Sequence, residues 1–76
     1  MVKGVTTLAS KPGHSVQQTL GPVSAQGGFG TVVSNLINDA NNRHPSANYI
    51  VLFEAREIAP GQFEAEGDAV ILTPEP

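Results

Sequence analysis

Alternating apolar and polar residues dominate the last thirty positions of the chain. From Phe63 to Thr73, small or apolar residues occupy every second position, and carboxylates occupy most of the early positions between them. A period of two residues is typical of a β-strand with one buried face. Residues 47–58 are apolar and β-branched in their first half, and Pro60-Gly61 supplies a turn between the two segments. The pattern therefore predicts one long β-hairpin.

A helical period appears in the middle of the chain. Apolar residues recur there at the spacing of one helix face: Phe29, Val32, Val33, Leu36, Ile37 and Ala40. Asn41-Asn42 and then His44-Pro45 indicate the end of the helix, because Asn accepts the left-handed cap and a residue before Pro is pushed out of the α region. We expect a single amphipathic helix over residues 28–42.

Two shorter segments near the start of the chain favour strands. Residues 2–8 are rich in Val and Thr, and residues 14–20 continue through 23–24 after a bend or bulge at Gly21-Pro22. A turn at residues 10–13 separates the two segments. The expected order is β-β-α-β-β. It predicts one α+β domain over residues 1–76, an antiparallel sheet with a single helix packed on one face.

The hairpin turn decides which residues lie beneath the helix. In a plain two-residue turn, Arg56 and Glu54 would face the core, whereas a bulge or an odd-length loop shifts the parity. We therefore expect a bulged register, with these residues beneath the helix: Tyr49, Val51, Phe53, Ala55, Phe63, Ala65, Ala69 and Ile71. The opposite face then carries Glu54, Arg56, Glu64, Glu66 and Asp68 at one end, and Ile50, Leu52, Val70 and Leu72 at the other.

These four aliphatic residues, Ile50, Leu52, Val70 and Leu72, are the predicted oligomer interface. One helix cannot cover both faces of a sheet, and each aliphatic side chain left in water forgoes ~1.5–3 kcal/mol of burial. A chain this short has a marginal core, and it contains no cysteine for disulfides. Oligomerisation is the remaining reinforcement. The alternative is that the first two strands or the C-terminal tail fold over the four residues.

Charge and hydropathy exclude several classes of partner. Seven acidic residues outnumber four basic ones, which gives a net charge of −3, and the basic residues are scattered. Binding of a nucleic-acid polymer needs clustered cations and is therefore not expected. No apolar stretch approaches the ~20 residues of a membrane span, and the start lacks the hydrophobic core of a signal peptide. We expect a soluble cytoplasmic protein, although a chain whose signal sequence had been removed would look the same.

The glycine-rich segment before the helix is a candidate anion site. Gly27, Gly28, Gly30 and Thr31 lead into the helix start, where exposed N–H groups and the helix dipole favour a negative charge. In an oligomer, pockets between subunits would bind a small anionic molecule or a nucleotide here, with Lys11, Arg43 or Arg56 as counter-charge. The segment lacks a following Lys and a GxGxxG pattern, so a plain strand-to-helix loop is the favoured alternative.

Metal binding has two candidate sets of ligands. His14 and His44 would hold a divalent metal if an oligomer brought symmetric copies together. The carboxylates Glu64, Glu66 and Asp68 suit hard cations, but charges on alternate positions also keep a sheet face soluble. No catalytic arrangement of Ser, His and Asp is recognisable. We therefore expect a non-enzymatic homo-oligomeric binding or scaffolding module without a cofactor, with anion binding and divalent-metal binding as alternatives.

Several short motifs, in order along the chain, resemble the YbjQ family, whose members are described as heavy-metal-binding. The motifs are Val5-Thr6-Thr7, Pro12-Gly13-His14, Leu20-Gly21-Pro22-Val23-Ser24, residues 47–51 and residues 63–72. The resemblance implies an α+β fold in a ring-like homo-oligomer, often a pentamer, and it supplies no catalytic residues. The chain departs from the family in lacking a long segment before the helix, in Ser46 where Gly is usual and in Asp68 where Thr is usual. Without cysteine, binding of a soft metal ion is not supported.

Overall fold

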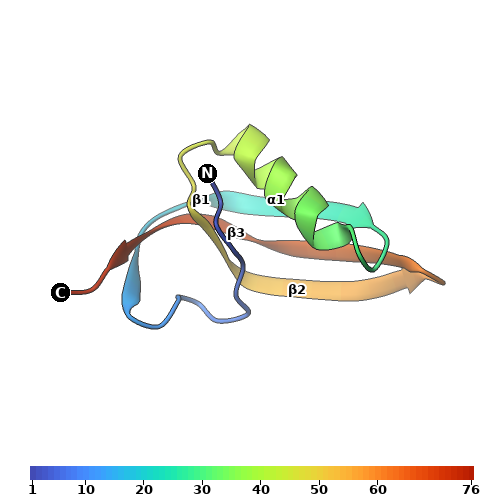
Figure 1. The fold of residues 1–76 in the computed structure, drawn as a ribbon, viewed down its shortest axis with the longest axis horizontal. Coiled ribbons are helices and arrows are strands. Elements are labelled where there is room, and N and C mark those ends of the chain that lie inside the picture. The colour runs from blue at the N-terminus through green and yellow to red at the C-terminus, as the bar shows by residue number, and fades with distance from the viewer.

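A three-stranded antiparallel sheet carries one helix on one face (Figure 1). The computed structural model describes residues 1–76. The strands are β1 (His14–Gly27), β2 (Tyr49–Ala59) and β3 (Gln62–Pro74), and the helix is α1 (Val32–Arg43). Their order in the sheet is β1-β3-β2, so the last strand in the sequence is the central one. The predicted α+β class, with a single helix over an antiparallel sheet, is confirmed.

The prediction of a regular strand over residues 2–8 is wrong. This N-terminal segment forms one isolated bridge, between Val5 and Ile50, and runs parallel to β2 rather than antiparallel. Its backbone still bonds to β2: the N–H of Ile50 donates to the Gly4 carbonyl at 3.1 Å, and the N–H of Phe53 donates to the Thr6 carbonyl at 2.9 Å. A bulge in β2, described below, prevents a regular ladder here. The fold is therefore β-α-β-β with a loosely attached N-terminal segment.

β1 follows the predicted strand over residues 14–24, with its bulge at Gly21, and continues to Gly27. It bends through register shifts between Val16 and Gln18 and between Thr19 and Gly21. Pro22 does not interrupt it, although proline cannot donate to a ladder. β1 lies at the edge of the sheet, and strand prolines are tolerated at edges and at bulges.

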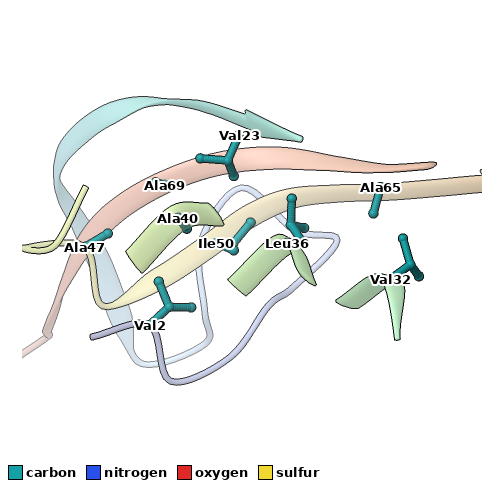
Figure 2. Packing of buried hydrophobic residues seen from close by; sticks show 9 residues of the cluster. All are labelled: Val2, Val23, Val32, Leu36, Ala40, Ala47, Ile50, Ala65 and Ala69. Carbon is teal, nitrogen blue, oxygen red and sulfur yellow. The ribbon is translucent and has the colours of Figure 1, made fainter. Parts of the chain in front are cut away.

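α1 covers β1 and β3 rather than β2. It begins four residues later than predicted, after a turn over residues 28–31, because glycine is a poor helix former. Phe29 therefore lies outside the helix and is 84% exposed, so its predicted place in the buried stripe is wrong. Figure 2 shows the main core between helix and sheet: Val2, Val23, Val32, Leu36, Ala40, Ala47, Ile50, Ala65 and Ala69.

Two bulges in β2 set the register of the hairpin. The first, between Glu57 and Ala59, gives the predicted shift near the turn, so that Ala65 pairs with Ala55 and Glu64 with Arg56. The second lies between Val51 and Glu54, where Leu52 adopts a positive φ of 55°. Gly67 faces this second bulge, because a Cβ there would stand 2.6 Å from the Ile50 Cγ2 atom.

The second bulge reverses the parity of the first half of β2. Ile50 belongs to the core beneath the helix, whereas Val51 and Tyr49 belong to a cluster on the opposite side. The predicted positions of Ile50, Val51 and Tyr49 are therefore wrong. Phe53 and Ala69 pack on the helix side, as predicted. We call the face of the sheet turned away from α1 the outer face.

One end of the outer face is covered by the chain itself. Val51, Val70 and Leu72 are buried there, with Tyr49 packed against them. The loop of residues 9–13 passes from β2 to the end of β3, since the Leu8 carbonyl accepts from Leu52 N–H and the Gly13 carbonyl accepts from Glu75 N–H, both at 2.9 Å. Of the four predicted interface residues, only Leu52 presents surface, at 49% exposure.

Candidate functional site

The strand alternation of β3 places Glu64, Glu66 and Asp68 on the outer face. Arg56 of β2 pairs in register with Glu64, and Glu54 pairs with Glu66. On its other side β3 pairs with β1, where Gln26 lies opposite Glu64 and Ser24 lies opposite Glu66. The sequence predicted this acidic face correctly, because a period of two residues fixes which side chains lie together.

We call Glu54, Glu64, Glu66 and Asp68 the acidic end of the outer face. These carboxylates differ in whether they pair with a cation. Arg56 forms an ion pair with Glu64, and the Gln26 amide donates to the second oxygen of Glu64 at 3.3 Å. The only other ion pair of the chain is Arg43 with Asp39, so Glu54, Glu66 and Asp68 have no cation at salt-bridge distance. Glu54 and Glu66 stand directly opposite one another, and like charges in that position destabilise a sheet.

A groove of about 460 Å³ runs along the carboxylates that have no cation partner. Glu54, Glu66 and Asp68 line it, together with Leu52 and with Pro22 and Ser24 of β1. Leu52 lies two residues before Glu54, so alternation places it on the same face, where it adds an aliphatic side chain beside the carboxylates. The prediction that Leu52 faces away from the helix is confirmed, but the predicted apolar patch around it is wrong, because the bulge turns Ile50 into the main core.

The other end of the outer face is basic. Lys3, Lys11 and His14 line a depression of about 280 Å³, next to Tyr49 and Leu72. The Lys11 ammonium lies over the Tyr49 ring, 5.5 Å from its centre, within the range of a cation–π interaction. This gathering of cations went unpredicted. Residues 3 and 11 reach it only because the N-terminal segment and the loop after it are fixed against β2 and β3.

In the glycine-rich turn before α1, several backbone N–H groups donate hydrogen bonds to acceptors of the same turn. The Gly28 N–H donates to the Thr31 hydroxyl at 3.0 Å, and the N–H groups of Thr31 and Val32 both donate to the Gly28 carbonyl. Gly27 packs closely against the helix start, where a Cβ would stand 2.7 Å from the Asn35 amide nitrogen. These contacts describe a turn closed by its own hydrogen bonds. Gly30, with open space around it, belongs to the same turn.

The cations predicted to accompany an anion lie elsewhere within the chain. Arg43 pairs with Asp39 at 2.9 Å in the last turn of α1, at the opposite end of the helix from residues 27–31. Arg56 is occupied by Glu64, and Lys11 lies over Tyr49. A single chain therefore does not bring the predicted anion site together.

The two histidines occupy separate places in the fold. His14 begins β1, and its Nδ1 lies 3.2 Å from the Pro12 carbonyl. His44 follows α1 and lies beside Gly21, where a Cβ would stand 3.3 Å from the His44 Nε2 atom. Nowhere does the chain place three or more His, Asp or Glu side chains so that they could hold a metal ion.

Asparagines tie the elements together, a role that the sequence did not reveal. The Asn48 side chain accepts from Leu72 N–H at 2.8 Å and donates to the Leu72 carbonyl at 2.9 Å. The Asn41 side chain accepts from Val2 N–H at 2.8 Å, which fixes the start of the chain to the helix.

The chain has no helix with the length and apolar character that crossing a membrane would require. No protein-family model and no curated protein matches the sequence, so the resemblance to the YbjQ family stays a prediction.

Proposed function

We propose that this protein is a non-enzymatic, homo-oligomeric binding or scaffolding module. The supporting observation is the amount of large apolar surface that one chain leaves in water. Only 13 of 76 residues are buried, whereas Phe29, Leu52 and Ile58 are 84%, 49% and 44% exposed. Further copies of the chain would cover such side chains.

The shape of the chain supports the same proposal. The radius of gyration is 12.2 Å and the longest dimension 44 Å, against a radius of about 11 Å for a compact domain of this length. An elongated, thin chain buries little of its surface by itself. Burial between copies supplies what a small core lacks, at about 25 cal/mol for each Å² of apolar surface removed from water.

The measurement is the mass of the protein in solution. Light scattering after size exclusion and sedimentation equilibrium, over a wide concentration range, should give a mass above the 7.9 kDa of one chain. A mass of one chain at every concentration would contradict the proposal. The YbjQ-like motifs favour a pentamer, and the mass distinguishes five copies from two.

The two alternative functions, binding of a small anion and binding of a divalent metal, need a separate test. Neither the anionic ligand at residues 27–31 nor a metal at His14 and His44 gains support from the positions of the side chains. Thermal unfolding with divalent metals and with nucleotides tests both, since a ligand at 100 times its dissociation constant stabilises the folded chain by ~2.7 kcal/mol.

A further inference from the structure

We propose that two copies of this chain pair through their outer faces in antiparallel orientation, so that the acidic end of each covers the basic end of the other. The inference rests on the proposed function and specifies it, because it names the partner as a second copy, the number as two and the surface as the outer face. In Figure 1 this face is the side of the sheet away from α1.

The two ends of the outer face carry opposite charges that are unpaired within one chain. Glu54, Glu66 and Asp68 have no cation at salt-bridge distance, and Lys3 and Lys11 have no carboxylate. Because both ends lie on the same face, a two-fold axis across the strands places each against its opposite. Such an isologous interface is closed, and it forms both sets of contacts at once.

The spacing along β3 suits this exchange. Glu66 marks the acidic end, and Val70, which pairs with Tyr49 beneath Lys11, marks the basic end. The two positions are four residues apart, or ~14 Å along an antiparallel strand. The two sets of charges therefore lie at separate places along the strand, and a two-fold rotation about an axis between them exchanges the two sets.

Leu52 supplies an apolar contact within the same surface. It lies half exposed in the acidic groove, and Tyr49 and Leu72 line the basic depression that would face it. A buried apolar centre within a polar rim is the usual anatomy of a protein interface. The whole chain is 44 Å long, and a standard interface buries ~800 Å² per partner.

The sheet edges are poorer places for association. β1 is bent by two register shifts and contains Pro22, and β2 beyond its bulge carries Glu54, Arg56 and Glu57. Bulges, prolines and charged side chains are the features that keep edge strands from pairing. Face-to-face pairing avoids both edges.

Charge reversal in two variants tests the pairing. The acidic-end variant carries Glu54→Lys and Glu66→Lys, and the basic-end variant carries Lys3→Glu and Lys11→Glu. In each variant both ends of the face have the same sign, so we expect its dimer dissociation constant to rise at least about tenfold above that of the unmodified chain. A 1:1 mixture of the two variants should restore a dimer, because the net charges of the ends that face one another are again opposite.

Matched controls keep the test independent of folding. Glu57→Lys makes the same substitution on β2 but on the helix side, where Glu57 pairs with Phe63, and it should change dimer affinity by less than about twofold. Circular dichroism checks that each variant is folded before its mass is measured.

The outcomes separate this inference from the proposed function. Reversal that weakens the dimer, with restoration on mixing, supports the pairing. An assembly that persists unchanged in both variants, or that responds equally to Glu57→Lys, overturns the pairing and leaves the oligomeric module standing. A mass of five chains overturns the pairing alone, and a single-chain mass for the unmodified protein overturns both.

Discussion

Gly67 lies where β3 passes the mid-strand bulge of β2, and its missing side chain is what lets the two strands approach. A Cβ at this position would stand 2.6 Å from Ile50 Cγ2 and 3.0 Å from the Val51 carbonyl oxygen. The second of these atoms belongs to the backbone and cannot rotate away. The residue and the bulge therefore depend on one another, although they lie on different strands.

Gly67→Ala should lower the free energy of unfolding by about 1–3 kcal/mol, because the extra methyl group overpacks a buried position. Urea denaturation at a fixed protein concentration measures the change. Gly30→Ala is the control: Gly30 has nothing within 4 Å of the new methyl group, so its stability should stay unchanged or rise slightly. Equal stability of the two variants would mean that the strands do not approach as described.

Asn48 acts between elements, at the start of β2. Its side-chain amide forms two hydrogen bonds with the backbone of Leu72, so it extends the pairing of β2 with β3 by one step beyond the strand itself. The contact also holds the end of β3 beside the outer-face cluster of Val51, Val70 and Leu72.

Asn48→Ala should destabilise the fold by about 1–3 kcal/mol, since it leaves a partly buried N–H and a carbonyl of Leu72 without partners. Hydrogen exchange should localise the effect, with faster exchange of the Leu72 amide than of the amide of Ala65 in the middle of β3. Asn42→Ala, at an exposed position near the end of α1, serves as the control. Uniform acceleration of both amides would contradict a local role for Asn48.

Local patterns allowed the helix, the hairpin and the bulge near its turn to be predicted. That bulge could be inferred because Arg56 and Glu54 would otherwise have faced the core. The bulge at Leu52 could not, since leucine rarely adopts a positive φ. Gly67 was the one available signal, because a glycine inside an alternating strand often marks a bulge or a close backbone approach. The acidic half of the candidate surface followed from alternation, but the basic half depends on contacts between distant segments and had no local pattern.

At the scale of the whole molecule, the chain has two apolar clusters of unequal size, one on each side of the sheet. The larger lies beneath α1 and the smaller is covered by the loop of residues 9–13. Leu52 and Phe53 are neighbours in sequence, and strand alternation places them on different sides: Leu52 lines the outer groove, and Phe53 packs against the main core. The same substitution at both positions therefore separates folding from association.

Leu52→Asn should leave stability of the single chain unchanged or slightly raised, because asparagine tolerates a positive φ better than leucine does. It should weaken self-association about tenfold, which corresponds to ~1.4 kcal/mol. Phe53→Asn should instead lower the free energy of unfolding by about 1–3 kcal/mol through a polar group placed against the core. Dilution series and urea titrations distinguish the two effects, and a reversal of the two roles would mean that the bulge lies elsewhere.

The position of β3 has a consequence for how the chain is made. A ribosome releases β1, α1 and β2 before β3, yet within the sheet β1 and β2 each pair with β3 and not with each other. Until the final strand emerges, neither early strand has a partner for its inner edge, and the helix has only part of the surface that it covers. The sheet therefore cannot form cotranslationally from β1 and β2 alone. A nascent or truncated chain that stops before Gln62 lacks the strand around which everything else assembles, so the sheet forms only after β3 has been synthesised.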